Sequence, residues 1–364
     1  MGIEVTNRRD ILAGLAASAF LPHQSWAQAG SPVAVSAARR ADGTYALVGL
    51  DGDGDVTFNL PLPARGHAAA AHPTRPEAVA MARRPGTFAL VVDCATGQTR
   101  ERLIAPEGHH FYGHAAFSGD GRYLFTTENA YGSGDGRIGV WDRAAGFKRV
   151  SEFSSGGVGP HEVIMLPDGN LAVANGGIRT HPHTGREKLN LDTMRSNLTL
   201  LTQAGEIKDQ AQVPHHMRLN SLRHIAALPD GTVGCGLQWQ GDIFETPVLL
   251  AIYSGQGQLG FVEIREPLLR TLKGYIGSIA GLSQHQFIAT APRGDKAIVF
   301  DRDKRVLATM ASIDVCGVAS SFHGNSLVTN GIGQVYRMQQ TGPIQLRNHG
   351  LAFDNHLVGL PSRT

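Results

Sequence analysis

The sequence predicts an all-β protein, a seven-bladed β-propeller. A hairpin frame repeats along the chain. In residues 159–177, GPHEVIMLPDGNLAVANGG, two apolar runs flank a turn of Pro167, Asp168 and Gly169, which is the pattern of a β-hairpin. The frame recurs at roughly 40- to 60-residue intervals, as in propeller-type arrays. The 45 glycines and the near absence of helical periodicity after residue 30 also favour short strands joined by tight turns.

The strand count predicts how the ring closes. Each blade is expected to contain four strands, numbered outward from the channel. Seven apolar or alternating runs are candidates for the third strand: 44–51, 87–93, 137–142, 196–201, 247–253, 296–301 and 333–338. Six innermost strands are expected to begin at His67, His114, His161, His224, Ser278 and Gly317. The run from His356 to Leu360 supplies the seventh if it pairs with the three strands that follow Val33, which removes the exposed sheet edges of an open array.

Residues 1–29 have the features of an export signal. Arg8 and Arg9 precede an apolar run, and Ala27, Gln28 and Ala29 form a small-x-small cleavage site. The paired arginines indicate the twin-arginine route, with an ordinary secretory signal as the alternative. The apolar run is too short to span a bilayer. We therefore expect cleavage near Ala29, a periplasmic location without a permanent membrane anchor, and one propeller domain over residues 30–364.

Composition excludes several classes of function. The chain has 33 Lys and Arg against 31 Asp and Glu, so no concentrated basic surface for nucleic acid is expected. Cys94, Cys235 and Cys316 have no metal-ligand spacing, and their odd number argues against a disulfide framework. They are interpreted as small buried hydrophobic residues. We expect a monomer.

Histidines open the innermost strands of five consecutive blades. Because neighbouring strands in a blade run antiparallel, the start of the first strand and the connection between the second and third strands lie at the same end of the ring. We therefore expect an arc of imidazoles around one mouth of the channel, from His67, His114, His161, His224 and His356. The connections at that mouth supply candidate ligand-binding residues: Glu128, Asn129, Asn175, Arg179, His181, His183, Arg186, Lys188, Trp239 and Arg293.

The long connection between Asn175 and Ser196 has no strand periodicity. Loops of this length inside a compact domain are usually functional or disordered. We expect it to form a lid or docking loop over the histidine mouth.

Three interpretations of the histidines remain open. Neutral imidazole is the commonest nitrogen ligand of copper, iron, nickel and zinc, so the arc predicts a metal or haem-iron site, with iron or copper as the candidate cofactor. The alternatives are a hydrated polar channel without a ligand and proton-transfer catalysis. A hydrolytic metal site would also need a carboxylate, for which Glu128 and Glu162 are the near candidates. No Gly-x-Ser-x-Gly motif is present.

The run GPHEVIMLPDGNLAVANGGIRTHPHTGREKLNLDTM, from residue 159, together with the histidine-led strands and the export signal, resembles the bacterial domain of unknown function 1513 family. The resemblance implies an exported seven-bladed propeller whose gene often accompanies imelysin-like and dihaem-oxidase-like iron-acquisition proteins. It assigns no reaction.

The leading hypothesis is a periplasmic propeller that binds a metal or a metal-bearing partner at the histidine mouth in iron handling, with periplasmic iron-acquisition proteins as partners. The alternatives are a redox or lactonase-type hydrolytic enzyme that uses the same mouth, and a metal-free interaction scaffold that uses the broad face of the ring. Propellers support all three functions, so the fold does not decide between them.

Overall fold

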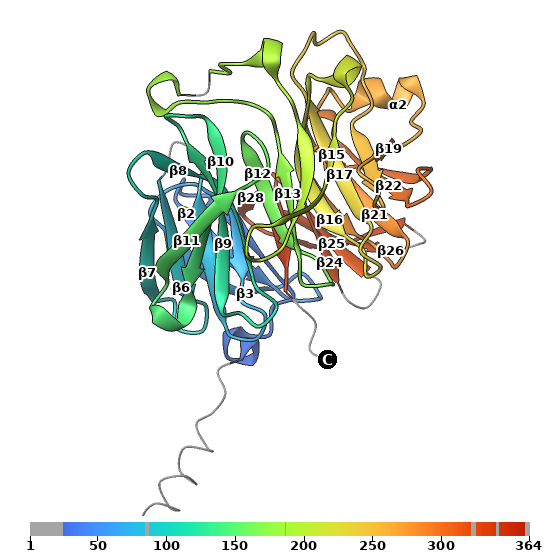
Figure 1. Ribbon diagram of the computed structural model, residues 1–364. Helices are drawn as coiled ribbons and strands as arrows, with labels where there is room; N and C mark the ends of the chain where they lie inside the picture. The colour runs from blue at the N-terminus through green and yellow to red at the C-terminus, as the bar shows by residue number, and fades with distance from the viewer. Residues whose placement is uncertain (1–24, 84–86, 186, 322–324, 340–341, 361–364) are drawn as a thin grey trace, which may run out of the picture.

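The strands form a ring of blades around a central channel (Figure 1). A computed structural model describes residues 25–83, 87–185, 187–321, 325–339 and 342–360. Within these ranges, seven antiparallel four-stranded sheets are present, and the predicted all-β seven-bladed propeller is confirmed.

The blades are numbered along the chain, and the strands of each run in order from the channel outward. Blade 1 contains β28 (Leu351–Gly359), β1 (Ala34–Arg40), β2 (Tyr45–Leu50) and β3 (Val56–Leu62). Blade 2 contains β4 (Gly66–Ala71), β5 (Glu77–Ala82), β6 (Phe88–Asp93) and β7 (Thr99–Ile104). Blade 3 contains β8 (His109–Phe117), β9 (Tyr123–Ala130), β10 (Asp135–Asp142) and β11 (Lys148–Ser154). Blade 4 contains β12 (Pro160–Met165), β13 (Leu171–Asn175), β14 (Asn197–Leu201) and β15 (Ile207–Gln212).

The remaining three blades follow the same order. Blade 5 contains β16 (Asn220–Ala227), β17 (Val233–Trp239), β18 (Leu250–Tyr253) and β19 (Leu259–Phe261). Blade 6 contains β20 (Ser278–Gly281), β21 (Gln286–Ala291), β22 (Lys296–Asp301) and β23 (Val306–Ala311). Blade 7 contains β24 (Val315–Ser321), β25 (Asn325–Asn330), β26 (Gln334–Gln339) and β27 (Gly342–Asn348). Short helices lie in the connections: η1 (Trp26–Ala29), η2 (Arg143–Ala145), η3 (Pro182–Thr184), η4 (Leu191–Thr193), η5 (His215–Met217), α2 (Glu266–Thr271) and η6 (Pro292–Gly294).

The ring closes in blade 1, as predicted. Strand β28, from the C-terminal part of the chain, pairs antiparallel with β1, with Ala34 opposite Gly359 and Arg40 opposite Leu351. The closing strand begins at Leu351, earlier than the run from His356 that the sequence indicated. Its side chains complete the packing against blade 7, where Phe353 and Leu357 are buried beside Leu327 and Val335.

The core lies between neighbouring blades. Strand β2 is buried along almost its whole length, whereas β7, at the outer edge of its blade, is mostly exposed. Between blades 5 and 6, Phe287 and Phe300 stack with their ring centroids 5.4 Å apart and pack in the same apolar cluster as Ile252. A strand buried on both faces reads as a continuous apolar run, which is why the third strands are recognisable in the sequence.

The segment just before blade 1 is packed onto the propeller. Trp26 in η1 is 6% exposed and belongs to an apolar cluster with residues of blades 1 and 2. Its Nε1 donates a hydrogen bond of 2.9 Å to the carbonyl oxygen of His72. Cleavage near Ala29 stays a prediction, and it would remove this contact. The rest of the predicted export signal, residues 1–24, lies outside the described residues.

The three cysteines are buried and free, in agreement with their interpretation as small hydrophobic residues. Burial raises the pKa of Cys94 to about 12 and also raises the pKa of Cys235 and Cys316, so none is prepared to act as a thiolate. In the described part of the chain, no helix has the length and apolar character needed to cross a bilayer.

Candidate metal centre

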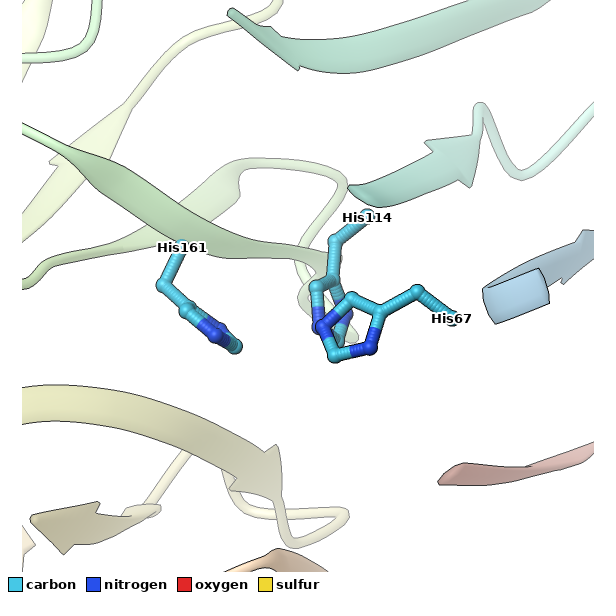
Figure 2. Close-up of side chains that lie close together, drawn as sticks. All are labelled: His67, His114 and His161. Atoms are coloured by element: carbon cyan, nitrogen blue, oxygen red, sulfur yellow. The ribbon is translucent and has the colours of Figure 1, made fainter. Parts of the chain in front are cut away.

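Five histidines meet inside the channel. His67, His114, His161, His224 and His356 lie on the innermost strands of blades 2, 3, 4, 5 and 1. In that order, successive ring centroids are 5.0, 4.8, 4.8 and 4.9 Å apart, and His356 returns to within 4.6 Å of His67. The five rings, which we call the histidine cluster, therefore form a closed group across the axis rather than the open arc expected at a channel mouth. Figure 2 shows His67, His114 and His161 pointing toward one another.

Irregular pairing in the inner strands places these side chains. All five strands show a register shift beside the histidine: between Gly66 and Ala69 in β4, Phe111 and Ala115 in β8, Pro160 and Glu162 in β12, Leu222 and His224 in β16, and Phe353 and Leu357 in β28. An unpaired residue in a β-bulge bends the strand and changes the direction of its side chain. Strand β24 also shifts register without carrying a histidine, and β20 pairs without a shift.

Gly113 makes the close approach of two histidines possible. Its φ of +102° lies in the region that favours glycine. A Cβ at this position would come within 2.5 Å of Cδ2 of His67. Glycine before His114 is therefore required for the contact of His67 with the bulged strand β8.

Four of the five imidazoles, those of His67, His161, His224 and His356, are held in the neutral form. Burial lowers the pKa of His67, His161 and His356 well below its usual value, and neighbouring imidazoles lower it further. Burial also lowers the pKa of His224, although Glu162 opposes that shift. Neutral imidazole is the form that coordinates metal ions.

Each histidine of the cluster has a buried ring nitrogen without a hydrogen-bond partner in the described structure: His67 Nδ1, His114 Nε2, His161 Nδ1, His224 Nδ1 and His356 Nε2. A buried polar atom without a partner costs about 1–3 kcal/mol, so native proteins rarely leave several of them together. The cluster thus offers nitrogen atoms of His67, His114, His161 and His356 to a ligand, while His224 Nδ1 lies 3.4 Å from Glu162 Oε2.

Glu162 supports two of the histidines from β12. Its Oε1 lies 3.5 Å from His114 Nδ1, and its Oε2 lies 3.4 Å from His224 Nδ1, where the angles do not meet hydrogen-bond geometry. The amide of Ile225 donates a 3.0 Å hydrogen bond to Oε2. Burial alone raises the pKa of Glu162, but His114 and His224 lower it more, which keeps the carboxylate ionised. A carboxylate beside a ligating histidine fixes the ring orientation and increases its basicity.

Two triads within the cluster have the spacing needed to hold a metal. His67, His114 and His161 form one, and His114, His224 and His356 form the other. Within each triad the ligand nitrogens lie within 4.8 Å of one another. First-row metals bind imidazole nitrogen at about 2.0–2.1 Å, so small side-chain rotations would bring three nitrogens onto one ion. His114 belongs to both triads and is the central residue of the cluster.

A cavity of about 290 Å³ opens on one side of the cluster. Four of the histidines face it, and it is also lined by Arg83, Tyr112, Ile178, Thr180, Lys188, Arg223, Gln238, Trp239, Gln240, Tyr275 and Arg293. On the other side, further along the inner strands, a second cavity of about 220 Å³ is lined mainly by apolar residues, with Glu162 near the histidines. The cluster therefore separates two different spaces within the channel.

Comparison with known proteins places the chain in a family. The sequence profile of the family described as "Protein of unknown function (DUF1513)" matches residues 60–360. The chain belongs to this family. The resemblance stated from the sequence is confirmed, and no curated protein shows significant sequence similarity to this DUF1513 chain. Among solved structures, it is similar to one described as "Streptogramin B lyase structure", with a TM-score of 0.56 and 12% identity over 82% of this chain and 91% of the other. At that identity the similarity shows the fold alone.

Only some of the predicted ligand-binding residues reach the cavity beside the cluster. Lys188, Trp239 and Arg293 line it as expected. The long connection contributes Ile178 and Thr180 as well, so part of the predicted lid does border the cavity.

Glu128 is not at the channel mouth. It is fully buried inside blade 3, where it accepts hydrogen bonds of 2.7 Å from Arg149 Nη2 and from Thr126 Oγ1. The same Arg149 nitrogen also donates to Glu152, and His109 lies beside that carboxylate. His109, Glu128 and Glu152 have metal-like spacing, but Arg149 already pairs with both carboxylates. This prediction failed because the partner, Arg149, comes from a strand that the local sequence does not reveal.

Asn129 and Asn175 are structural residues. Asn129 Nδ2 donates a 3.1 Å hydrogen bond to the carbonyl oxygen of Thr180 and lies 3.1 Å from His110 Nε2. Asn175 Nδ2 donates to the carbonyl oxygen of Ser155 at 2.9 Å. Both side chains are buried. Asn175 uses both of its amide atoms in hydrogen bonds, whereas Asn129 Oδ1 has no hydrogen-bond partner in the described structure.

The remaining candidates lie on the outside of the long connection. Arg179 and His183 are exposed, and neither lines the cavity. His181 packs with its ring 5.2 Å from Tyr131 and 4.9 Å from His183. Arg186 lies outside the described residues.

Several residues at the cavity were not selected from the sequence: Tyr112, Arg223, Gln238 and Tyr275. Arg223 directly precedes His224, which was a usable signal once His224 was expected at the channel. Tyr275 follows helix α2 and enters the site through an isolated bridge with Gln238, a contact without a local signature.

Proposed function

We propose that this DUF1513 protein binds a first-row transition metal ion, iron or copper, at the histidine cluster and acts in periplasmic metal handling. The observation that carries the proposal is the convergence of five imidazoles from five blades, each with a buried nitrogen that lacks a hydrogen-bond partner in the described structure. Imidazole nitrogen suits iron and copper as well as zinc and nickel.

The surroundings of the cluster favour a metal over a merely hydrated channel. A hydrated channel does not require neutral imidazoles, nor a carboxylate placed against two of them. The lowered pKa values of His67, His161 and His356 keep these rings available for coordination. Glu162 stands in the position of an outer partner of His114 and His224.

The cellular role in the proposal comes from the sequence. Arg8, Arg9 and the apolar run after them support export to the periplasm. The family resemblance supports iron handling together with iron-acquisition partner proteins. A metal bound between blades 1 to 5 would be shielded from bulk solvent and would leave only through one of the two cavities.

Elemental analysis tests the proposal. We expect protein purified without chelator or affinity metal to contain iron or copper, or to take up one of them stoichiometrically. His114→Ala removes a ligand from both triads and should abolish this binding. His216→Ala, at an exposed histidine of η5, is the matched control and should bind like the wild type. Equal metal content in wild type and a folded His114→Ala variant would favour the polar-channel interpretation instead.

A proton-transferring enzyme is the second candidate. It is favoured by the contact of the Glu162 carboxylate with His114 and His224 beside a cavity. The fold neighbour is described as a lyase, so an enzyme occurs on a similar propeller. Turnover of lactone or ester substrates that disappears in Glu162→Gln would support this candidate. A metal-loaded wild type without turnover would leave metal handling as the function.

A further inference from the structure

Four cationic side chains surround the cavity beside the histidine cluster. They are Arg83, Lys188, Arg223 and Arg293, and no Asp or Glu lines the cavity among the described residues. The four come from separate segments: the end of β5, the long connection of blade 4, strand β16 and helix η6. Positive charge is therefore concentrated on this space from several directions by the fold, not by a run of basic sequence.

Neighbouring groups hold these cations in place. The guanidinium of Arg293 lies 4.3 Å from the ring centroid of Tyr275. Arg223 Nε donates a 2.7 Å hydrogen bond to Ser221 Oγ, and Arg83 Nη1 lies 3.6 Å from Asp354 Oδ1. Side chains anchored in this way lose less entropy when they bind a ligand.

Repulsion between the neighbouring positive charges favours the binding of an anion in this cavity. Burial lowers the pKa of Lys188, and the charges of Arg223 and Arg293 lower it further. An anion between these groups would relieve the repulsion and accept charge-assisted hydrogen bonds from the cationic side chains. A ligand with more than one negative charge would use several of the cations at once.

The walls favour an organic anion over an inorganic one. Tyr112, Trp239 and Tyr275 add aromatic surface, and Ile178 adds aliphatic surface. The cavity of about 290 Å³ exceeds by several times the roughly 30 Å³ that one water molecule occupies in the liquid. It therefore has room for a small carbon skeleton that carries several oxyanion groups.

We propose that this cavity binds a small polycarboxylate, whose oxygen atoms reach the imidazoles of His67, His161, His224 and His356 that face it. The anion site is inferred from the positive charges that line the cavity. Its role as an oxygen-donor ligand that completes the coordination of the metal rests on the proposed function. The metal would then be held jointly by imidazole nitrogen and carboxylate oxygen.

Calorimetric titration of citrate into metal-free protein tests the anion site. Binding should weaken as sodium chloride is added, because salt screens the attraction. Arg293→Gln and the double variant Arg223→Gln/Arg293→Gln should weaken binding by about tenfold or more. Arg270→Gln, on the exposed face of α2 and outside the cavity, is the matched control and should bind like the wild type. Circular dichroism should show all variants folded.

Three results would overturn the anion site: no citrate binding by folded wild type, unchanged affinity in folded Arg293→Gln, or phosphate binding as tight as citrate. Because the titration uses metal-free protein, it separates the two proposals. Citrate binding that persists in His114→Ala, together with an absence of metal binding in the wild type, would sink the metal proposal and leave the anion site standing. Metal binding by the wild type without citrate binding would refute the anion site and leave the metal proposal standing.

Discussion

The two halves of the central channel share four inner strands, β4, β8, β12 and β28, but have opposite character. The half that begins at the histidine cluster carries cations, amides and aromatic rings. The other half is lined by alanines of β4 and β8 and by larger apolar residues such as Ile164, Ile279 and Val358. Strands β4, β8, β12 and β28 thus carry polar residues toward the first cavity and mostly apolar residues toward the second.

The difference shows how a repeated scaffold builds a single site. The later residues of the inner strands keep regular pairing, and their side chains pack between blades. Among the inner strands, a register shift occurs beside each histidine of the cluster and also in β24, which carries none. Glu162 connects the halves, since it lines the apolar cavity and contacts His114 and His224.

Deletion of the closing strand should disrupt both halves of the channel, because the ring can no longer close. Removing residues 350–364 takes away the pairing with β1, the buried Phe353 and Leu357, and the proposed ligand His356. Each of the two apolar side chains contributes about 1.5–3 kcal/mol, out of a total stability of about 5–15 kcal/mol. We expect loss of the cooperative thermal transition in calorimetry and loss of metal uptake. Removing residues 361–364 alone is the control, and an unchanged melting temperature in the longer deletion would refute closure by β28.

Acid should destabilise the metal-free protein through the histidine half of the channel. The folded-state pKa values of His67, His161, His224 and His356 are lowered, so the unfolded chain takes up protons first as the pH falls below about 6.5. Stability is then lost at about 1.4 kcal/mol per pH unit for each such histidine, down to its folded-state pKa.

Urea unfolding between about pH 7.5 and about pH 5.5 measures this loss. His161→Ala should lose about 1.4 kcal/mol less than the wild type over this whole interval. Ile279→Val, in the apolar half, should retain the wild-type pH dependence. Equal pH dependence in wild type and His161→Ala would mean that the imidazole is protonated in the folded protein.

Substitution of Glu162 should have a smaller effect, on metal affinity, that distinguishes the histidine half of the channel from the apolar half. Glu162→Gln keeps an oxygen for the amide of Ile225 but removes the charge beside His114 and His224. Loss of such an outer partner typically weakens metal binding by about 10- to 100-fold. Competition with a chromophoric chelator measures the affinity. Ile279→Val should cost about 0.5–1.5 kcal/mol of stability and leave metal affinity unchanged, and metal affinity that is unaltered in Glu162→Gln would remove its supporting role.

The architecture could be predicted from the sequence because the local strand and turn patterns agree with the fold. The third strands are buried on both faces and read as apolar runs, while turns such as Pro167-Asp168-Gly169 mark the hairpins. The closing strand was found by counting, since a ring of seven needs a seventh innermost strand. Its start at Leu351 was missed because residues before His356 read as a polar turn.

The candidate site was predictable only in part. The five histidines were found because they recur in register, yet their depth and closure depend on bulges that leave no composition signal. Glu128 was misplaced because its partner Arg149 is brought to it by strand pairing. Arg223 and Tyr275 reach the cavity through contacts between blades and connections that are distant in sequence.

Because the ring is closed by β28, the histidine cluster cannot form before that strand is made. In the order of synthesis, β28 follows the strands of all the other blades, so β1 stays unpaired on its inner edge until His356 and its strand emerge. A nascent or truncated chain thus lacks both a ligand and a wall of the channel. Under the proposed function, uptake of the ion would then report that β28 has been made and has paired with β1.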